Sequence, residues 1–287
     1  MKVLHVAVFT SRSTNVWQAD GFEVLGHRVI RYDYRADLKR FNCMSKRDDY
    51  LITLCRKERP DLILFSKCNL MDVRVVKECN KVGATVLWYM DDQGPNWDLE
   101  LIDKMRHVNY VFCSVKKCAE DAKIFCKNSY RLQGGFDPVV HCPMFLPKIR
   151  DAVFIGTLRP EKEIFRKCAF SIKTGVYNEA HSRFVSETKI NLNFTHGGGT
   201  SNRLYKLMAA GGFVLTEPWD GLMEDFTPGK DFVVFTSPND LNEKIQYYLA
   251  HEEERNEIAD QGRRTVMKYD NVNYARVISE KVWSKHL

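Results

Sequence analysis

The chain has 287 residues and a mass of 33.4 kDa, a length typical of about two domains. Hydrophobic residues make up 44% of it and aromatic residues 12%, which excludes intrinsic disorder as the main state. No apolar run approaches the ~18 residues of a membrane helix. The apolar segment at residues 2–9 is too short for an export signal and indicates a first strand. We therefore expect a soluble, cytoplasmic protein.

The nine cysteines are irregularly spaced, and no two of them form a Cys-x-x-Cys pair. This pattern predicts free thiols in a reducing compartment rather than a disulfide framework. It also lacks the paired ligand spacing of a zinc site, so we expect no metal.

The net charge of +6 is concentrated in the first half of the chain. Residues 1–145 hold 23 basic and 18 acidic side chains, and residues 28–59 alone hold ten basic and five acidic ones. Two interpretations fit this segment. Its cations lie on a solvated helical face, or they attract a polyanionic partner such as nucleic acid.

Apolar runs alternate with helix-length segments from the start of the chain. Strands are predicted at 2–9, 28–33, 61–66, 84–90 and 109–114, with helices between them at 45–59, 71–82, 97–107 and 116–127. Apolar runs without strict alternation are typical of parallel strands that are covered on both faces. The pattern predicts a doubly wound α/β domain over residues 1–145.

A linker with Gly134, Gly135 and Pro138 interrupts this alternation, and a second α/β series then begins. Its strands are predicted at 151–157, 170–176, 190–195, 213–217 and 231–236, and helices follow from Ser237 to a last one at 273–285. The second domain is therefore expected over residues 146–287, with a helical C-terminal segment.

A glycine-rich loop joins a predicted strand to a predicted helix in the second domain. It consists of His196, Gly197, Gly198, Gly199, Thr200, Ser201, Asn202 and Arg203. Glycines allow a ligand close to the backbone, and the N–H groups that start a helix attract an anion such as a phosphate. Arg203 would add a cation to the same phosphate. The alternative is an ordinary strand-to-helix turn.

The segment Ser201–Glu217 and the residues after it resemble a known family. The other matching stretches are 220–222, 226–230 and 255–263 in the second domain, with looser ones at 25–29, 88–92, 112–115 and 135–138 in the first. Together they resemble the spore-maturation-protein-like glycosyltransferases, which have the GT-B fold of two facing Rossmann-like domains. The resemblance implies transfer of a sugar from a nucleotide-sugar donor, with UDP as the expected nucleotide. The donor would bind the second domain and the acceptor the first, with no cofactor and no metal.

Lys206 departs from the family pattern. Members often have a glutamate there that binds the ribose of the donor, and a lysine cannot accept those hydrogen bonds. Glu217 or a backbone group would then take this role, or the donor is bound differently. By its position after the strand at 151–157, the loop with Arg159 and Lys162, and Arg166 beyond it, resembles the loop that faces the donor diphosphate.

Asp91 and Asp92 follow a predicted parallel strand at the end where α/β proteins bind ligands. One of them could act as general base toward the acceptor hydroxyl if the reaction inverts the sugar centre. Capping of the next helix is the alternative role.

The acceptor is expected near Ser11, Arg12 and Ser13 in the first strand-to-helix loop. The cations Arg35, Lys39 and Arg40 suggest a polyanion as acceptor, specifically a hydroxymethylated base in DNA. A cell-surface glycan or a small metabolite is the alternative acceptor. A non-catalytic nucleotide- or nucleic-acid-binding module and a nucleotide-sugar epimerase are the rival functions.

Overall fold

The computed structural model describes residues 1–91 and 97–283, which form two compact units. Unit 1 combines Met1–Gly135 with the C-terminal segment that begins at Asn271, and unit 2 is Phe136–Asp270. The sequence predicts a boundary between residues 145 and 146 and assigns the last helix to the second domain. The structure instead places the boundary after Gly135 and the last helix in unit 1.

Unit 1 contains, within its described residues, a six-stranded parallel sheet in the order β2-β1-β3-β4-β5-β6. Its strands are β1 (Lys2–Ala7), β2 (Arg28–Asp33), β3 (Leu62–Ser66), β4 (Ala84–Tyr89), β5 (Tyr110–Cys113) and β6 (Ser129–Arg131). Its helices are α1 (Thr14–Val24), α2 (Tyr34–Phe41), α3 (Met44–Glu58), α4 (Val73–Cys79), α5 (Leu99–His107), α6 (Lys116–Asp121), the short 3-10 turn Ala122–Ile124 and α12 (Asn271–Trp283).

Successive side chains of β3 enter the cores on opposite faces of this sheet. Ile63 and Phe65 pack among residues of α3, α4 and α5, whereas Leu62 and Leu64 pack with residues of α1 and α12. Because both faces are covered by helices, the strand is apolar along its whole length, as the sequence predicts.

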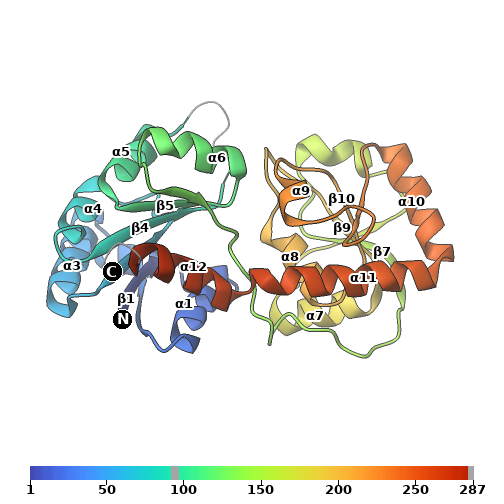
Figure 1. Cartoon of the computed structure of the whole chain (residues 1–287), viewed down its shortest axis with the longest axis horizontal. Helices are drawn as coiled ribbons and strands as arrows, with labels where there is room; N and C mark the ends of the chain where they lie inside the picture. The colour runs from blue at the N-terminus through green and yellow to red at the C-terminus, as the bar shows by residue number, and fades with distance from the viewer. Residues whose placement is uncertain (92–96, 284–287) are drawn as a thin grey trace. The chain divides into compact units, whose positions relative to one another are not determined.

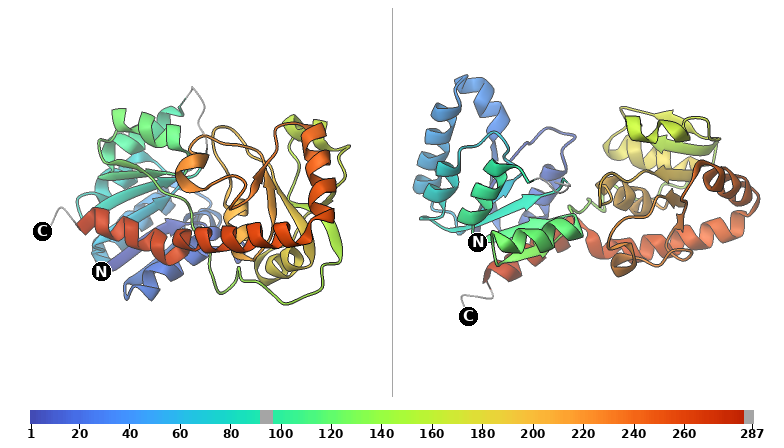
Figure 2. Two further views of the ribbon diagram at one scale, coloured as in Figure 1. Left: turned by 45° about the vertical axis from the view of Figure 1, so that its right-hand side comes forward. Right: turned by 90° about the horizontal axis from the view of Figure 1, so that it is seen from above.

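The C-terminal helix α12 belongs to the core of unit 1 and lies beside α1 (Figures 1 and 2). Gly21 makes this close approach possible, because a Cβ there would lie 2.1 Å from the backbone oxygen of Asn271. The Asn271 side chain in turn donates a hydrogen bond to the Trp17 carbonyl at 3.0 Å. Tyr274 meets Trp88 edge-on, with ring centroids 5.5 Å apart.

Unit 2 contains a five-stranded parallel sheet in the order β11-β10-β9-β7-β8. The strands are β7 (Arg150–Ile155), β8 (Ser171–Lys173), β9 (Thr188–Asn193), β10 (Val214–Thr216) and β11 (Val233–Val234). The helices are α7 (Asn178–Ser186), α8 (Asn202–Ala209), α9 (Leu222–Asp225), α10 (Pro238–Ala250) and α11 (Glu252–Val266), with 3-10 turns at Pro160–Phe165 and Met267–Tyr269. Both faces are again apolar: Phe154 enters one core and Val153 the other.

The predicted α/β class with two parallel sheets is confirmed. All nine cysteines are free thiols. Over residues 1–91 and 97–283, no helix combines the length and the apolar character that a membrane span requires.

Candidate functional site

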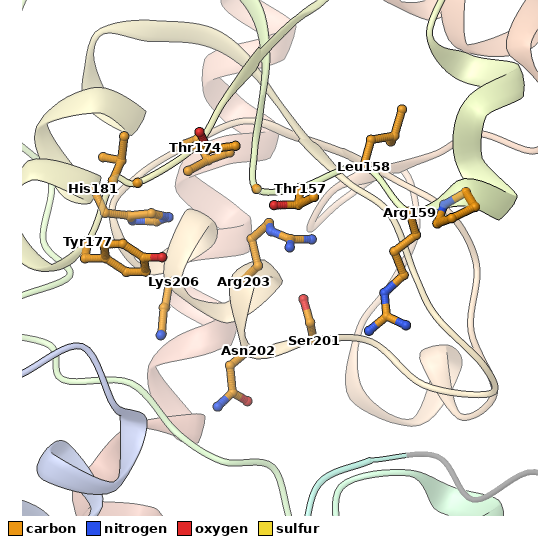
Figure 3. A pocket seen from close by; sticks show the side chains of 15 residues that line it. Thr157, Leu158, Arg159, Thr174, Tyr177, His181, Ser201, Asn202, Arg203 and Lys206 are labelled. Atoms are coloured by element: carbon orange, nitrogen blue, oxygen red, sulfur yellow. The ribbon is translucent and has the colours of Figure 1, made fainter. Parts of the chain in front are cut away.

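A pocket of about 700 Å³ opens in unit 2 at the carboxyl ends of β7 and β8 (Figure 3). Three segments form its walls: the loop after β7, the connection from β8 to α7, and the start of α8. The side chains labelled in Figure 3 are Thr157, Leu158, Arg159, Thr174, Tyr177, His181, Ser201, Asn202, Arg203 and Lys206. Ligands of parallel α/β sheets bind at this end of the strands.

Arg203 projects from the first turn of α8 into this pocket (Figure 3). The residue before the helix, Ser201, has extended backbone but makes no side-chain capping bond, so the first-turn N–H groups are not used by a cap. The guanidinium carbon of Arg203 lies 4.5 Å from the centre of the Phe154 ring. Gly156 leaves room for it, because a Cβ there would lie 2.8 Å from Nη2 of Arg203.

The pocket lining contains three cations, Arg159, Arg203 and Lys206, and no carboxylate. Burial, and to a lesser degree the charge of Arg159, lowers the pKa of Arg203 to about 10. Burial and the charge of Arg203 lower the pKa of Lys206 to about 8. Arg203 and Lys206 are thus partly desolvated and repel each other, and a bound anion would relieve both costs.

His181 adds a buried, uncharged ring to the same wall. Burial, followed by the charges of His141, Lys206 and Arg203, lowers the pKa of His181 to about 3. Its Nδ1 has no hydrogen-bond partner within the described part of the chain. The neighbouring His141 approaches the Asp137 carbonyl at 3.0 Å through its own Nδ1.

The predicted donor-binding residues divide into two groups. Arg159, Ser201, Asn202 and Arg203 line the pocket, whereas Lys162, Arg166, His196, Gly197, Gly198, Gly199, Thr200 and Glu217 lie outside the lining. Thr174, Tyr177 and His181 were not predicted from the sequence, since no motif marks the β8–α7 connection or the first turn of α7.

Several residues of the second group are held by nearby partners. Lys162 pairs with Glu217 at 2.7 Å, and Glu217 also accepts the backbone N–H of Thr195 at 2.9 Å. The exposed side chains of Arg166 and Glu163 pair at 2.5 Å. Glu217, which we considered as a ribose ligand, therefore has its carboxylate engaged away from the pocket.

The glycine run has a local structural role of its own. His196 and Gly199 pair as an antiparallel bridge, which makes the run a tight turn, and Gly197 has a φ of 58°. His196 meets Glu161 at 2.9 Å, and Thr200 accepts a hydrogen bond from Asn193 at 3.1 Å.

In unit 1, Asp91 follows β4 and forms an ion pair with Lys67, which follows the neighbouring strand β3. The Lys67 Nζ and the Asp91 Oδ2 lie 2.5 Å apart, and the Asp91 side chain is 47% exposed. Lys67 and Cys68 have positive φ angles of 62° and 53°, conformations that side chains other than glycine rarely adopt. Asp98, not Asp91, caps α5 by accepting the N–H of Glu100 at 2.8 Å. Asp92 lies outside the described residues.

The predicted acceptor residues lie in two places on unit 1. Ser11 and Arg12 are exposed in the loop after β1, and Ser13 caps α1. Arg35, Lys39 and Arg40 are exposed on α2, where Arg40 lies 3.6 Å from Asp37. Four other basic side chains at 28–59 also form ion pairs with carboxylates: the pairs are Arg28–Glu58, Arg31 with Asp20 and Glu23, Arg47–Asp48, and Arg56–Glu78.

Comparison with known proteins identifies the fold. The chain resembles Anabaena HepE, solved in complex with UDP-glucose, at a TM-score of 0.74 and 10% identity, over 99% of this chain and 100% of that one. Sucrose-phosphate synthase from Thermosynechococcus elongatus aligns at a TM-score of 0.69 and 11% identity, over 100% and 99% of the two chains. AviGT4, a glycosyltransferase involved in avilamycin A biosynthesis, aligns at 0.63 and 11% identity, over 98% and 97%. The two parallel sheets therefore form a GT-B fold.

The sequence comparison supplies the class of protein. Residues 145–279 match the family described as glycosyl transferase-like, and no curated protein sequence matches the chain. Taken with the GT-B fold, this match identifies the chain as an enzyme of the glycosyltransferase class.

Proposed function

We propose that this enzyme transfers a sugar from a UDP-sugar to a hydroxyl acceptor. One observation carries the proposal: Arg159 and Arg203 flank the uncapped start of α8 in a pocket whose lining has no carboxylate. A diphosphate supplies the negative charge that these groups lack. HepE, which shares the fold, was solved with UDP-glucose, and this supports the choice of nucleotide.

The reaction requires that the leaving diphosphate be stabilised and that the acceptor hydroxyl lose its proton. The acceptor oxygen bonds to the anomeric carbon while the bond from that carbon to the diphosphate breaks, and the diphosphate leaves with the electron pair. Arg203, Arg159 and the first amides of α8 would stabilise this growing charge, which is the role we give them in place of a metal. In an inverting reaction the acceptor proton would pass to Asp91, held by Lys67.

For the acceptor, we retain a hydroxymethylated DNA base as one candidate. Exposed Arg35 and Lys39 on α2 support it, whereas the carboxylate partners of the other basic side chains reduce the charge that would face a polyanion. A glycan or small metabolite is the competing candidate. Membership of the spore-maturation-protein-like family is part of the same proposal, as is a cytoplasmic location, which the nine free thiols favour.

The test is a donor and acceptor panel with two matched arginine variants. UDP release and product mass are measured with several UDP-sugars, each with glycan, small-molecule and hydroxymethylated duplex acceptors. Arg203→Ala should weaken UDP binding at least ~10-fold, the scale of a charge-assisted hydrogen bond. Arg166→Ala removes an exposed arginine outside the pocket and should leave binding unchanged. Equal affinities in both variants, or UDP binding without transfer to any acceptor, would contradict the proposal.

A further inference from the structure

The connection that follows β3 carries Lys67, and its backbone is strained at two successive positions. Lys67 and Cys68 have φ angles of 62° and 53°, in the left-handed region that side chains other than glycine rarely adopt. The backbone N–H of Lys67 donates to the Trp88 carbonyl at 3.0 Å and so extends the pairing of β3 with β4. The direction that the Lys67 side chain takes toward Asp91 therefore depends on what holds this bend.

A buried ammonium group holds the bend from the side of α5. Lys104 is 3% exposed, and its Nζ donates to the Cys68 carbonyl at 3.2 Å and lies 3.5 Å from the Asn69 carbonyl oxygen. A carboxylate oxygen of Glu100 lies farther away, at 3.8 Å, on an exposed side chain. Burial of a cation costs free energy, and hydrogen bonds to the strained connection offset part of that cost here.

A second buried cation contacts the same connection from α3. The Arg47 side chain is buried, and its Nη2 donates to the Leu70 carbonyl at 2.5 Å. Its Nε donates to the Asp48 carboxylate at 2.8 Å, which balances its charge. Cations from two helices thus hold the backbone of residues 68–70. Of the two, Lys104 bonds to a strained residue itself, directly next to Lys67.

We propose that Lys104 is a positioning residue for sugar transfer, because its hydrogen bond to the Cys68 carbonyl directs Lys67 toward Asp91. The inference rests on the proposed function, in which Asp91 takes the proton of the acceptor. Lys104 acts through the backbone of Lys67 and Cys68 on the ion pair of Lys67 with Asp91. Proton transfer depends on the geometry of the base, so loss of Lys104 slows turnover, whereas UDP binding in unit 2 does not depend on it.

The test compares kcat in two backgrounds, with the UDP-sugar and acceptor pair that gives most product in the panel above. In the wild-type background, Lys104→Met should lower kcat about tenfold and leave the Kd for UDP within about twofold of its wild-type value. In a Lys67→Met background, Lys104→Met should lower kcat by less than about twofold, because the side chain that it positions is already absent. A purely structural effect would lower kcat by the same factor in both backgrounds.

Lys2→Met is the matched control. Lys2 also donates from its Nζ to a backbone carbonyl of unit 1, that of Glu58 at 2.5 Å, but it lies at the amino end of β1. This variant should keep the wild-type kcat. Thermal unfolding shows whether each variant is folded under the assay conditions. If Lys104→Met is not, Lys104→Gln takes its place in the comparison, since an amide group still fills part of the buried site.

The possible results separate this inference from the proposed function. Normal kcat in Lys104→Met, equal losses in the two backgrounds, or an equal loss in Lys2→Met would overturn the positioning role and leave Asp91 as the base. Normal kcat in Asp91→Asn would overturn the assignment of the base and this inference with it.

Discussion

Lys67 and Asp91 follow neighbouring strands of one sheet, β3 and β4, and the Lys67 Nζ lies 2.5 Å from the Asp91 Oδ2. The lysine reaches this position from a backbone in the left-handed region, with a φ of 62°, and Cys68 after it shares that conformation. Two successive non-glycine residues of this kind cost free energy, and such strain is common at functional sites. The ion pair fixes the carboxylate of Asp91 at the carboxyl end of the sheet, where a parallel α/β unit binds its ligands.

If Asp91 is the general base, Asp91→Asn should lower turnover about 100-fold or more and leave the Kd for UDP unchanged. Lys67→Met should lower turnover less, because it releases the carboxylate without removing it. Asp49→Asn is the matched control, since Asp49 is also an exposed, ion-paired aspartate, 2.7 Å from Arg74. Normal turnover in Asp91→Asn would assign the proton to another group and favour a retaining mechanism.

Gly156→Ala should weaken UDP binding without any change of charge. Gly156 has a φ of 152°, and the added methyl group would come within 2.8 Å of the Arg203 guanidinium. We expect the arginine to be displaced and the affinity for UDP, measured by calorimetry, to fall about tenfold. Gly26→Ala imposes a comparable backbone strain, at a φ of 79°, but its methyl group would meet nothing within 4 Å. A loss of affinity in both variants would point to general destabilisation.

Lys206 should make the unliganded protein less stable at neutral pH than a neutral side chain would. Burial lowers its pKa from 10.5 to about 8, so between these values the unfolded chain binds more protons than the folded one. The contribution of Lys206 to stability therefore rises with pH through this window. Urea unfolding should show Lys206→Met more stable than wild type by about 1–3 kcal/mol at pH 7, an advantage that shrinks toward pH 10. Lys230→Met should show no such dependence.

Three buried histidines should destabilise the protein in mild acid. Burial is the main cause that lowers the pKa of His5, His141 and His181 to about 3. Below pH 6.5 the unfolded chain binds protons that the folded chain does not bind. The free energy of unfolding therefore decreases as the pH is lowered. Each histidine should remove about 2 kcal/mol from the free energy of unfolding between pH 7 and pH 5. Urea titrations of His5→Gln should show a smaller loss over this interval than those of the wild-type protein.

The sequence predicts the sheets better than it predicts the site. Apolar runs mark most strands, because both faces of each sheet are covered, but the three-residue strand β6 is too short to stand out. Helix α2 was not predicted, although Asp33 before it accepts the N–H groups of Arg35 and Ala36, as an N-cap residue does. In the site, the start of α8 follows from the glycine-rich loop. Contacts between residues far apart in the sequence cannot be predicted in this way. The ion pair of Lys162 with Glu217, at 2.7 Å, joins positions that are 55 residues apart.

The return of α12 to unit 1 makes unit 2 an insertion within unit 1. A fragment ending at Gly135 would lack Tyr274 and Ile278, and the apolar side chains of Phe22 and Trp88 that pack in the same core would be exposed to water. Unit 2, by contrast, is continuous from Phe136 to Asp270 and contains the whole pocket around Arg203. Separate expression should therefore give an aggregating N-terminal fragment and a folded central one, and a short linker from Gly135 to Asn271 should restore solubility to unit 1. The chain can thus be divided for study only by excising its middle, and not by cutting it in two.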